Sequence, residues 1–186
     1  MYVKYTYLCD NKTPDIDGLA FEFALESEYP TSSPEFYGTC PANSIVVDAE
    51  TITEEQFNEA KASELQARKT LLTQRNNAAY ENAISQMTHE YPPSEIQTWE
   101  RQREEAVAWG VDPLSATPWI DSAAAARGVP REIYLSRTLA KITAFAMASA
   151  WHTGRRQGIE DQIRAADSFL SIGSVAIDYT LPGAGE

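Results

Sequence analysis

The sequence contains few of the residue types that build metal sites or disulfide frameworks. Its 186 residues include two cysteines and two histidines. Cys9 and Cys40 lie in different segments and lack Cys-x-x-Cys spacing, so the sequence predicts neither a bound metal nor a cofactor. Free thiols are the expectation for a reducing cytoplasm, and a Cys9–Cys40 disulfide is the alternative.

Basic residues are also scarce. The chain has 15 Lys and Arg against 27 Asp and Glu, which gives a net charge of −12. Residues 1–60 contain 12 acidic residues and only Lys4 and Lys12 as basic ones, whereas the later residues are close to balance. Non-specific binding of nucleic acid needs clustered Lys and Arg, so nucleic acid is not an expected partner. The acidic first third suits a basic protein partner or a solvated face.

Long apolar runs are missing as well. No stretch approaches the length of a membrane span, so a membrane is not an expected partner either. The first residues, Met-Tyr-Val-Lys-Tyr-Thr-Tyr, lack the basic and apolar regions of a signal peptide. We therefore expect synthesis and folding in the cytoplasm.

Recognisable catalytic motifs are absent from the sequence. It contains neither a Gly-x-Ser-x-Gly nucleophile motif nor a Gly-rich phosphate loop. Glu100, Glu104 and Glu105 could supply paired carboxylates for glycoside hydrolysis, which need to face each other across a cleft. Their position beside arginines on consecutive helical turns favours a charged helix face instead. We predict no catalytic residue.

Two further clusters of polar residues have simpler interpretations. The run at 15–18, Asp-Ile-Asp-Gly, is similar to part of a calcium loop, but an EF-hand register would put Ala24 where the closing carboxylate belongs. We interpret this run as a turn. Arg156 and Glu160 have the spacing of an ion pair on a solvated helix face, with His152 at the boundary of the core.

Residues 1–50 have the composition of a small β domain. Segments 2–8 and 19–25 are rich in Tyr, Val, Phe and Thr, and segment 44–48 contains Ile-Val-Val. Residues 27–43 contain three prolines and a glycine, which predict a loop. These patterns predict a three-stranded antiparallel sheet.

The pattern then changes to helical periodicity. Thr53 and Gln56 have the spacing of a capping box, and the helix that they start is predicted to continue to about His89. Heptad-like apolar positions at Leu65 and Leu72 are interrupted by Arg68. This predicts either a weak coiled coil or a helix whose first half projects and whose second half packs.

Prolines and glycines divide the rest of the chain into further helices. Ser94 is the predicted N-cap of a helix that ends at Gly110, Thr117 and Pro118 begin a short helix that ends at Gly128, and the last helix covers residues 131–168. Small residues at 148–150 and Gly154 predict that a neighbouring helix approaches closely. Residues 174–179 have the composition of a strand that pairs with the N-terminal sheet or with a partner.

The sequence thus predicts an α+β, mostly α fold with four consecutive parts. These are a small acidic β and loop domain at 1–50, a long connecting helix at 51–90, a helical bundle at 91–168 and an extended tail at 169–186.

Aromatic residues in a proline-rich, acidic loop are the predicted interface. Rigid rings with low ordering cost are typical interface anchors, which singles out Tyr29, Phe36 and Tyr37. The alternative is that these rings fold back onto the small sheet. Trp151 is a further interface candidate because its long helix can present it to a partner, whereas the other tryptophans are expected in the core.

Residues 68–167 carry the most recognisable pattern. They include Tyr-Pro before a capped helix with Trp99, Ala-Ala-Ala-Arg-Gly-Val at 124–129 before a long alanine-rich helix, and Gly-Arg-Arg-Gln-Gly-Ile-Glu-Asp-Gln-Ile at 154–163. This pattern resembles a helical module of tail-fibre-associated and tail-fibre assembly proteins of tailed phages. The resemblance covers a little over half of the chain.

The resemblance implies a non-enzymatic phage tail protein that acts by protein–protein contacts. The chain would be a subunit of the tail fibre or baseplate, or an assembly chaperone, with a fibre, baseplate or tail-tube protein as partner and homo-oligomers allowed. It would lie in the host cytoplasm during assembly and in the virion tail afterwards. Because the recognisable motifs record caps and packing, the choice of partner is expected in the acidic residues 1–50.

Two hypotheses from other classes stay open. A small hydrolase of the host envelope would need titratable residues that converge in a cleft. An inhibitory protein that mimics nucleic acid would present regularly spaced carboxylates on one face.

Overall fold

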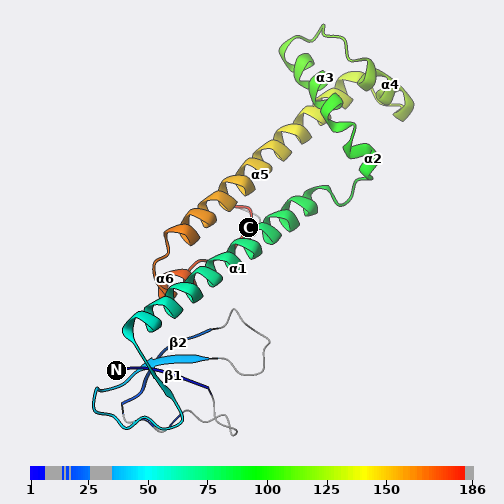
Figure 1. Ribbon diagram of the computed structural model, residues 1–186. Helices are drawn as coiled ribbons and strands as arrows, with labels where there is room; N and C mark the ends of the chain where they lie inside the picture. Colours follow the sequence, from blue (N-terminus) through cyan, green and yellow to red (C-terminus); the bar gives the residue numbers. More distant parts are fainter. Residues whose placement is uncertain (7–13, 15, 17, 26–34, 183–186) are drawn as a thin grey trace. The chain divides into compact units, whose positions relative to one another are not determined.

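The computed structural model of the chain describes residues 1–6, 14, 16, 18–25 and 35–182 (Figure 1). Within these residues the fold is α+β and mostly helical, with a small N-terminal antiparallel sheet and a long helix, as predicted. The strands are β1 (Tyr2–Tyr5), β2 (Ala20–Ala24), β3 (Phe36–Thr39) and β4 (Glu50–Ile52). The helices are α1 (Glu54–Thr88), α2 (Pro93–Ile96), α3 (Trp99–Val111), α4 (Pro118–Arg127), α5 (Arg131–Ala165) and α6 (Phe169–Gly173).

Contacts between residues divide the chain into two compact units. The first combines Met1–Gln74 with Asp161–Val175, and the second combines Arg75–Glu160 with Ala176–Glu186. Both long helices, α1 and α5, contribute residues to each unit. Each unit therefore combines segments that are distant in sequence, whereas the four parts predicted from the sequence are each continuous.

The sheet of the first unit has four antiparallel strands in the order β2-β3-β1-β4. The first two predicted strands are confirmed, but the third, at residues 44–48, is wrong. In that segment Asp48 has a φ of 58°, in the left-handed region that a strand does not use. Ile45 is 80% exposed, so the apolar pattern does not reflect burial. Two strands of the sheet, β3 and β4, are not among the predicted strands, and β3 lies within the segment predicted as a loop.

Both faces of the sheet are covered, so its side chains form two apolar clusters. Alternating residues such as Val3 and Phe36 pack with loop residues, including Ile16, on one face. The other face carries Phe23 and Tyr37, whose stacked rings have centroids 4.7 Å apart. A proline-rich segment can thus hold a buried strand because each of its rings meets a partner on one face or the other.

The N-terminal end of α1 covers the second face. The predicted capping box is present: Gln56 N donates to Thr53 Oγ1 at 3.1 Å, and Thr53 N donates to Gln56 Oε1 at 2.9 Å. One turn later Phe57 is 4% exposed, and its ring centroid lies 5.4 Å from that of Phe23. The alternative in which the first half of this helix projects is therefore wrong, because Phe57 anchors it to the sheet.

Arg68, which interrupts the apolar seam of α1, has its own packing role. Its Nε donates to Glu64 Oε1 at 2.8 Å, and another of its nitrogens donates to the Ala24 carbonyl at 3.3 Å. The guanidinium also lies 4.8 Å from the ring centroid of Phe169 in α6. The buried Glu64 carboxylate is thereby paired, which lowers the cost of burying it.

The start of the predicted extended tail is helical instead. Ser168 and Ser171 form a capping box at α6, with Ser171 N donating to Ser168 Oγ at 3.2 Å. The predicted pairing of residues 174–179 with the N-terminal sheet is also wrong, since this segment joins no sheet, whereas its pairing with a partner stays a prediction. Side-chain bonds hold it in place of a ladder, including Arg155 Nε to the Asp178 carbonyl at 3.1 Å.

In the second unit, α1 and α5 run antiparallel. Asn76 Nδ2 donates to the Arg156 carbonyl at 3.0 Å, and the hydroxyls of Tyr80 and Thr153 lie 3.3 Å apart. The later residue of α1 thus contacts the earlier residue of α5, as antiparallel helices require. Tyr179 OH completes the bonds of Asn76 by donating to its Oδ1 at 2.6 Å. The small residues of α5 do not all mark a close approach, because a Cβ on Gly154 would meet nothing within 4 Å.

Two predicted helix boundaries are corrected in the shorter helices. Ser94 lies inside α2 and caps nothing, because the chain turns at residues 97–98 and α3 begins at Trp99. Gly110 is not a C-cap, since α3 continues past it and a Cβ there would lie 3.2 Å from Leu139 Cδ2. The boundaries of α4 are confirmed: Pro118 is at its start, and Gly128 ends it with a φ of 69°.

Replacing Gly38 tests the pairing of β2 and β3. A Cβ there would lie 2.6 Å from the Ala20 carbonyl oxygen, which belongs to the neighbouring backbone. We expect Gly38→Ala to lower the free energy of unfolding by about 1–3 kcal/mol in urea denaturation. Gly154→Ala is the matched control and is expected to raise it by about 0.5–1 kcal/mol, because this helical site is open. Wild-type stability of Gly38→Ala would contradict the strand contact.

The Tyr179 hydroxyl predicts a loss of stability at alkaline pH. Burial raises the pKa of Tyr179 above its ordinary value of 10.0, although Arg156 and Arg155 oppose the shift. The folded state thus binds the phenol proton more tightly, so this contribution is complete below pH 10 and disappears as pH rises through the raised pKa.

Tyr179→Phe is expected to remove this pH-dependent component and to lower the free energy of unfolding near neutral pH by about 1 kcal/mol. Urea denaturation of both proteins at neutral and alkaline pH measures the difference. Tyr134→Phe is the control, because the Tyr134 hydroxyl bonds to no residue that the structure describes. An unchanged difference between wild type and Tyr179→Phe across this range would contradict the prediction.

Candidate functional site

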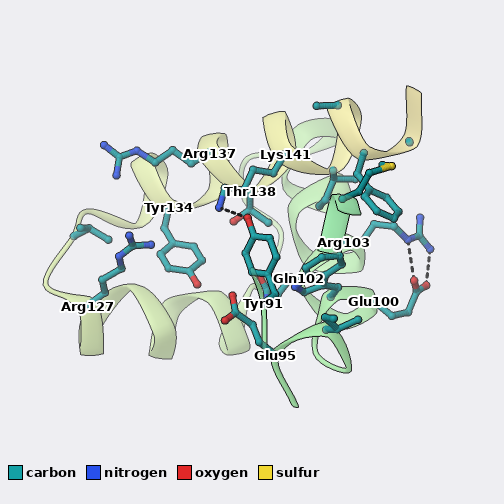
Figure 2. A pocket seen from close by; sticks show the side chains of 18 residues that line it. Tyr91, Glu95, Glu100, Gln102, Arg103, Arg127, Tyr134, Arg137, Thr138 and Lys141 are labelled. Carbon is teal, nitrogen blue, oxygen red and sulfur yellow. Dashed lines mark hydrogen bonds and ion pairs between the residues drawn. The ribbon is translucent and has the colours of Figure 1, made fainter. Parts of the chain in front are cut away.

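The second unit contains a pocket of about 700 Å³ between its helices. Its walls come from α2, α3 and α5, with Met87 of α1 and Arg127 of α4 at the edges. Figure 2 shows the side chains that line it. The volume is in the range of ligand-binding pockets in proteins.

Aromatic rings form much of the pocket lining. Trp99 stands edge-on to two of them, with its ring centroid 5.1 Å from that of Tyr91 and 5.7 Å from that of Phe145. Tyr134 adds a fourth ring. Edge-to-face contacts hold such rings in fixed orientations, so the apolar lining is preformed.

Basic side chains outnumber acidic ones around the pocket. Four basic residues, Arg103, Arg127, Arg137 and Lys141, line it together with Glu95 and Glu100. Arg103 and Glu100 neutralise each other through two hydrogen bonds of 2.6 and 3.1 Å. The hydrogen bond from Arg103 also holds the pKa of Glu100 below its ordinary value.

The remaining cations lack acidic partners. Arg127 and Arg137 form no ion pair with any residue in the described part of the chain. Lys141 Nζ lies 3.4 Å from Tyr91 OH and 5.5 Å from the centroid of its ring. In Figure 2, Arg127 and Arg137 lie at the Tyr134 end of the pocket, opposite the Arg103–Glu100 pair. One end of the pocket is therefore positively charged.

A buried carboxylate fixes the helices that carry this pocket. Glu105 of α3 is 5% exposed, and it accepts hydrogen bonds from Trp119 N at 3.2 Å and Ile120 N at 3.0 Å. These amides belong to the first turn of α4, where amides lack helical partners and negative charge is favourable. Arg101 Nε adds a third bond at 3.1 Å. Glu105 is thus a cap on another helix, which corrects its predicted place on a charged helix face.

Arg131 connects α5 to the same corner. Its guanidinium donates to Thr117 Oγ1 at 2.8 Å, to Asp121 Oδ1 at 2.7 Å and to the Ser115 carbonyl at 3.0 Å. The buried Thr117 hydroxyl in turn donates to Asp121 Oδ1 at 2.8 Å. This network explains why Thr117 does not cap α4 itself, and it places α4 against the start of α5.

The structure gives different answers for the predicted interface residues. Phe36 and Tyr37 are 9% and 6% exposed in β3, so the alternative that these rings pack on the sheet is correct for both. They are not exposed anchors, because each ring meets a cluster of the sheet. Tyr29 lies outside the described residues. Trp151 is half-buried on α5, with its ring edge-on to His152, and its role as an interface residue stays a prediction.

The other polar candidates are scattered. Cys40 is a buried free thiol, and Cys9 and the acids at 15 and 17 lie outside the described residues. The Arg156–Glu160 ion pair is present at 3.0 Å, and the buried His152 has no hydrogen-bond partner for its Nδ1 among the described residues. Among the described residues, no three His, Cys, Asp or Glu side chains gather where a metal ion could bind. None of the described helices has the length and apolar character to cross a membrane.

The acidic side chains of the first unit are partly paired. Lys4 Nζ lies 3.1 Å from Glu50, its cross-strand neighbour in β4, and 3.4 Å from Glu35, which directly precedes β3. The hydrogen bond with Glu50, more than the charge of Glu35, raises the pKa of Lys4. These two carboxylates therefore surround a cation, unlike the unpaired row that a nucleic-acid mimic would present.

The pocket is a feature that the sequence did not predict. Tyr134, Arg137, Lys141 and Phe145 recur at three- and four-residue spacing, so they share one face of α5. This mixed aromatic and basic stripe is the available signal. The turn that brings Tyr91 over the stripe had no comparable signal.

Comparisons of this chain with known protein families, with curated proteins and with solved structures found no match.

Glu105→Gln tests the cap on α4. The amide group of Gln has one acceptor oxygen, so one amide of α4 would face an N–H donor. We expect a loss of about 1–3 kcal/mol in the free energy of unfolding, measured by urea denaturation. Glu104→Gln is the matched control: its exposed pair with Arg101 at 3.7 Å is worth at most about 1 kcal/mol. Equal stability of the two variants would show that the cap is dispensable.

Proposed function

We propose that this chain is a non-enzymatic phage tail protein that acts by protein–protein contacts. It serves as a subunit of the tail fibre or baseplate, or as a chaperone of their assembly. The host cytoplasm during assembly is its first location, and the virion tail is the second if it is a subunit.

The observation that carries this proposal is that the carboxylates of α3 bond to neighbouring arginines or to the backbone of α4. Glu100 is paired with Arg103, Glu104 lies beside Arg101, and Glu105 caps α4. Of these carboxylates, Glu105 joins α3 to α4, whereas Glu100 and Glu104 form ion pairs with arginines of their own helix. A module whose polar groups serve packing is suited to presenting a rigid surface.

The pocket supports a binding role for that surface. Arg, Trp and Tyr are the residue types that most often dominate the energy of protein interfaces. All three line the pocket, in Arg137, Trp99 and Tyr91, and the rings are held by edge-to-face contacts. Preformed anchors lower the ordering cost of binding.

Deletion of the coding sequence from the phage that carries it tests the proposal. We expect particles with defective or missing tail fibres or baseplates in electron micrographs, with capsids still filled, and rescue by the wild-type chain supplied in trans. Mass spectrometry of purified wild-type virions then separates the two roles, because a subunit is present at stoichiometric amounts and a chaperone is absent. Normal tails and normal infectivity of the deletion phage would overturn the proposal.

A further inference from the structure

The charge of the pocket is opposite to that of the chain that carries it. The protein has a net charge of −12, yet three exposed cations that form no ion pair with any described residue line this pocket. These are Arg127 from the end of α4 and Arg137 and Lys141 from α5. Exposed cations keep most of their hydration, so an incoming anion gains attraction at a small desolvation cost.

The spacing of the cations selects the kind of anion. Arg137 and Lys141 are four residues apart on α5, which puts their Cβ atoms about 6 Å apart on neighbouring turns. Two separate carboxylates on one face of a peptide have similar spacing. The aromatic lining beside them, with Trp99 and Phe145, offers an apolar seat for one large side chain.

We propose that this pocket docks an acidic segment of a partner protein, with one aromatic or large aliphatic side chain against Trp99 and carboxylates paired with Arg127, Arg137 and Lys141. This rests on the proposed function, because it assigns a chemistry to the protein–protein contact. The mode is that of a peptide in a groove, where apolar anchors give affinity and flanking charges fix register.

A protein segment is favoured over a nucleic acid by the other charges of the rim. Glu95 also lines the pocket, and its carboxylate would face the phosphates of any strand that followed it. Binding of a nucleic-acid backbone needs a continuous basic track, whereas a peptide brings carboxylates at a few positions only.

Selection from a random peptide library by mRNA display on the full-length protein tests the proposal and assumes nothing about which protein is the partner. We expect enriched peptides to combine Glu or Asp with Trp, Phe, Tyr or Leu. One enriched peptide, labelled with fluorescein, is then titrated by anisotropy with wild type, with Arg137→Glu and with Lys141→Glu. Each charge reversal is expected to weaken its binding by about tenfold or more, and added salt to weaken wild-type binding.

Arg75→Glu is the matched control for charge. Arg75 is an exposed residue of α1 in the same unit, and it does not line the pocket. We expect this variant to bind the peptide as wild type does. All of the reversed side chains are exposed, so urea midpoints close to wild type are expected for every variant.

Several outcomes would overturn the proposal. Enrichment of neutral or basic peptides, no enrichment, or equal loss of affinity in Arg75→Glu would mean that no acidic segment docks in this pocket. Displacement of the peptide by a single-stranded oligonucleotide that binds more tightly would assign the pocket to nucleic acid. Self-association in sedimentation that Arg137→Glu abolishes, without peptide binding, would assign it to a second copy.

Failure of this proposal is distinguishable from failure of the proposed function. A deletion phage with a tail defect that Arg137→Glu rescues fully would keep the tail function and reject the docking role of the pocket. A deletion phage with normal tails would reject the tail function, even if acidic peptides bind as expected.

Discussion

The carboxylate of Glu105 is the interaction on which the helical module of the second unit depends. It places a negative charge at the first turn of α4, where Trp119 N and Ile120 N need acceptors. A carboxylate buried without such partners would cost several kcal/mol, so the bonds to α4 and to Arg101 are what make its burial tolerable. These bonds fix the first turn of α4 against α3, and the position of Arg127 follows because it lies at the end of α4.

The start of α5 is held at the same corner of the second unit as the start of α4. Arg131 at its start donates to Thr117 Oγ1, Asp121 Oδ1 and the Ser115 carbonyl, so the first turn of α5 is tied to the same corner that Glu105 holds. The residues that follow on α5, Tyr134 to Phe145, then supply one wall of the pocket. The binding surface is thus made of side chains on a frame that the hydrogen bonds of the buried Glu105 and Thr117 hold together. Such a frame keeps anchor residues in place at little entropic cost.

Local signals in the sequence predicted the local features well. Thr53 with Gln56, and Pro118 with Gly128, depend on residues within a few positions, so spacing alone identified the start of α1 and both ends of α4. The same logic failed at β3, because proline-rich composition predicts a loop unless strands distant in sequence supply hydrogen bonds. It failed at Glu105 for a related reason, since a charged residue on a helix gives no local sign that it caps another helix.

The charge of the pocket was also not predictable from local sequence patterns. Net charge is a sum over the whole chain, and here it is dominated by the acidic first third. The field at a binding site is set by the charges within about a Debye length, roughly 8 Å at physiological salt. Pairing removes Arg103 and Glu100 from that sum and leaves Arg127, Arg137 and Lys141 against the single carboxylate of Glu95. An acidic chain can therefore offer a cationic docking surface, and an acidic partner would meet attraction at the pocket while repulsion from distant carboxylates is screened. The charge of the sequence favours a basic partner, whereas the cations of the pocket favour an acidic one, and this difference arises because the fold brings residues of α4 and α5 to one pocket.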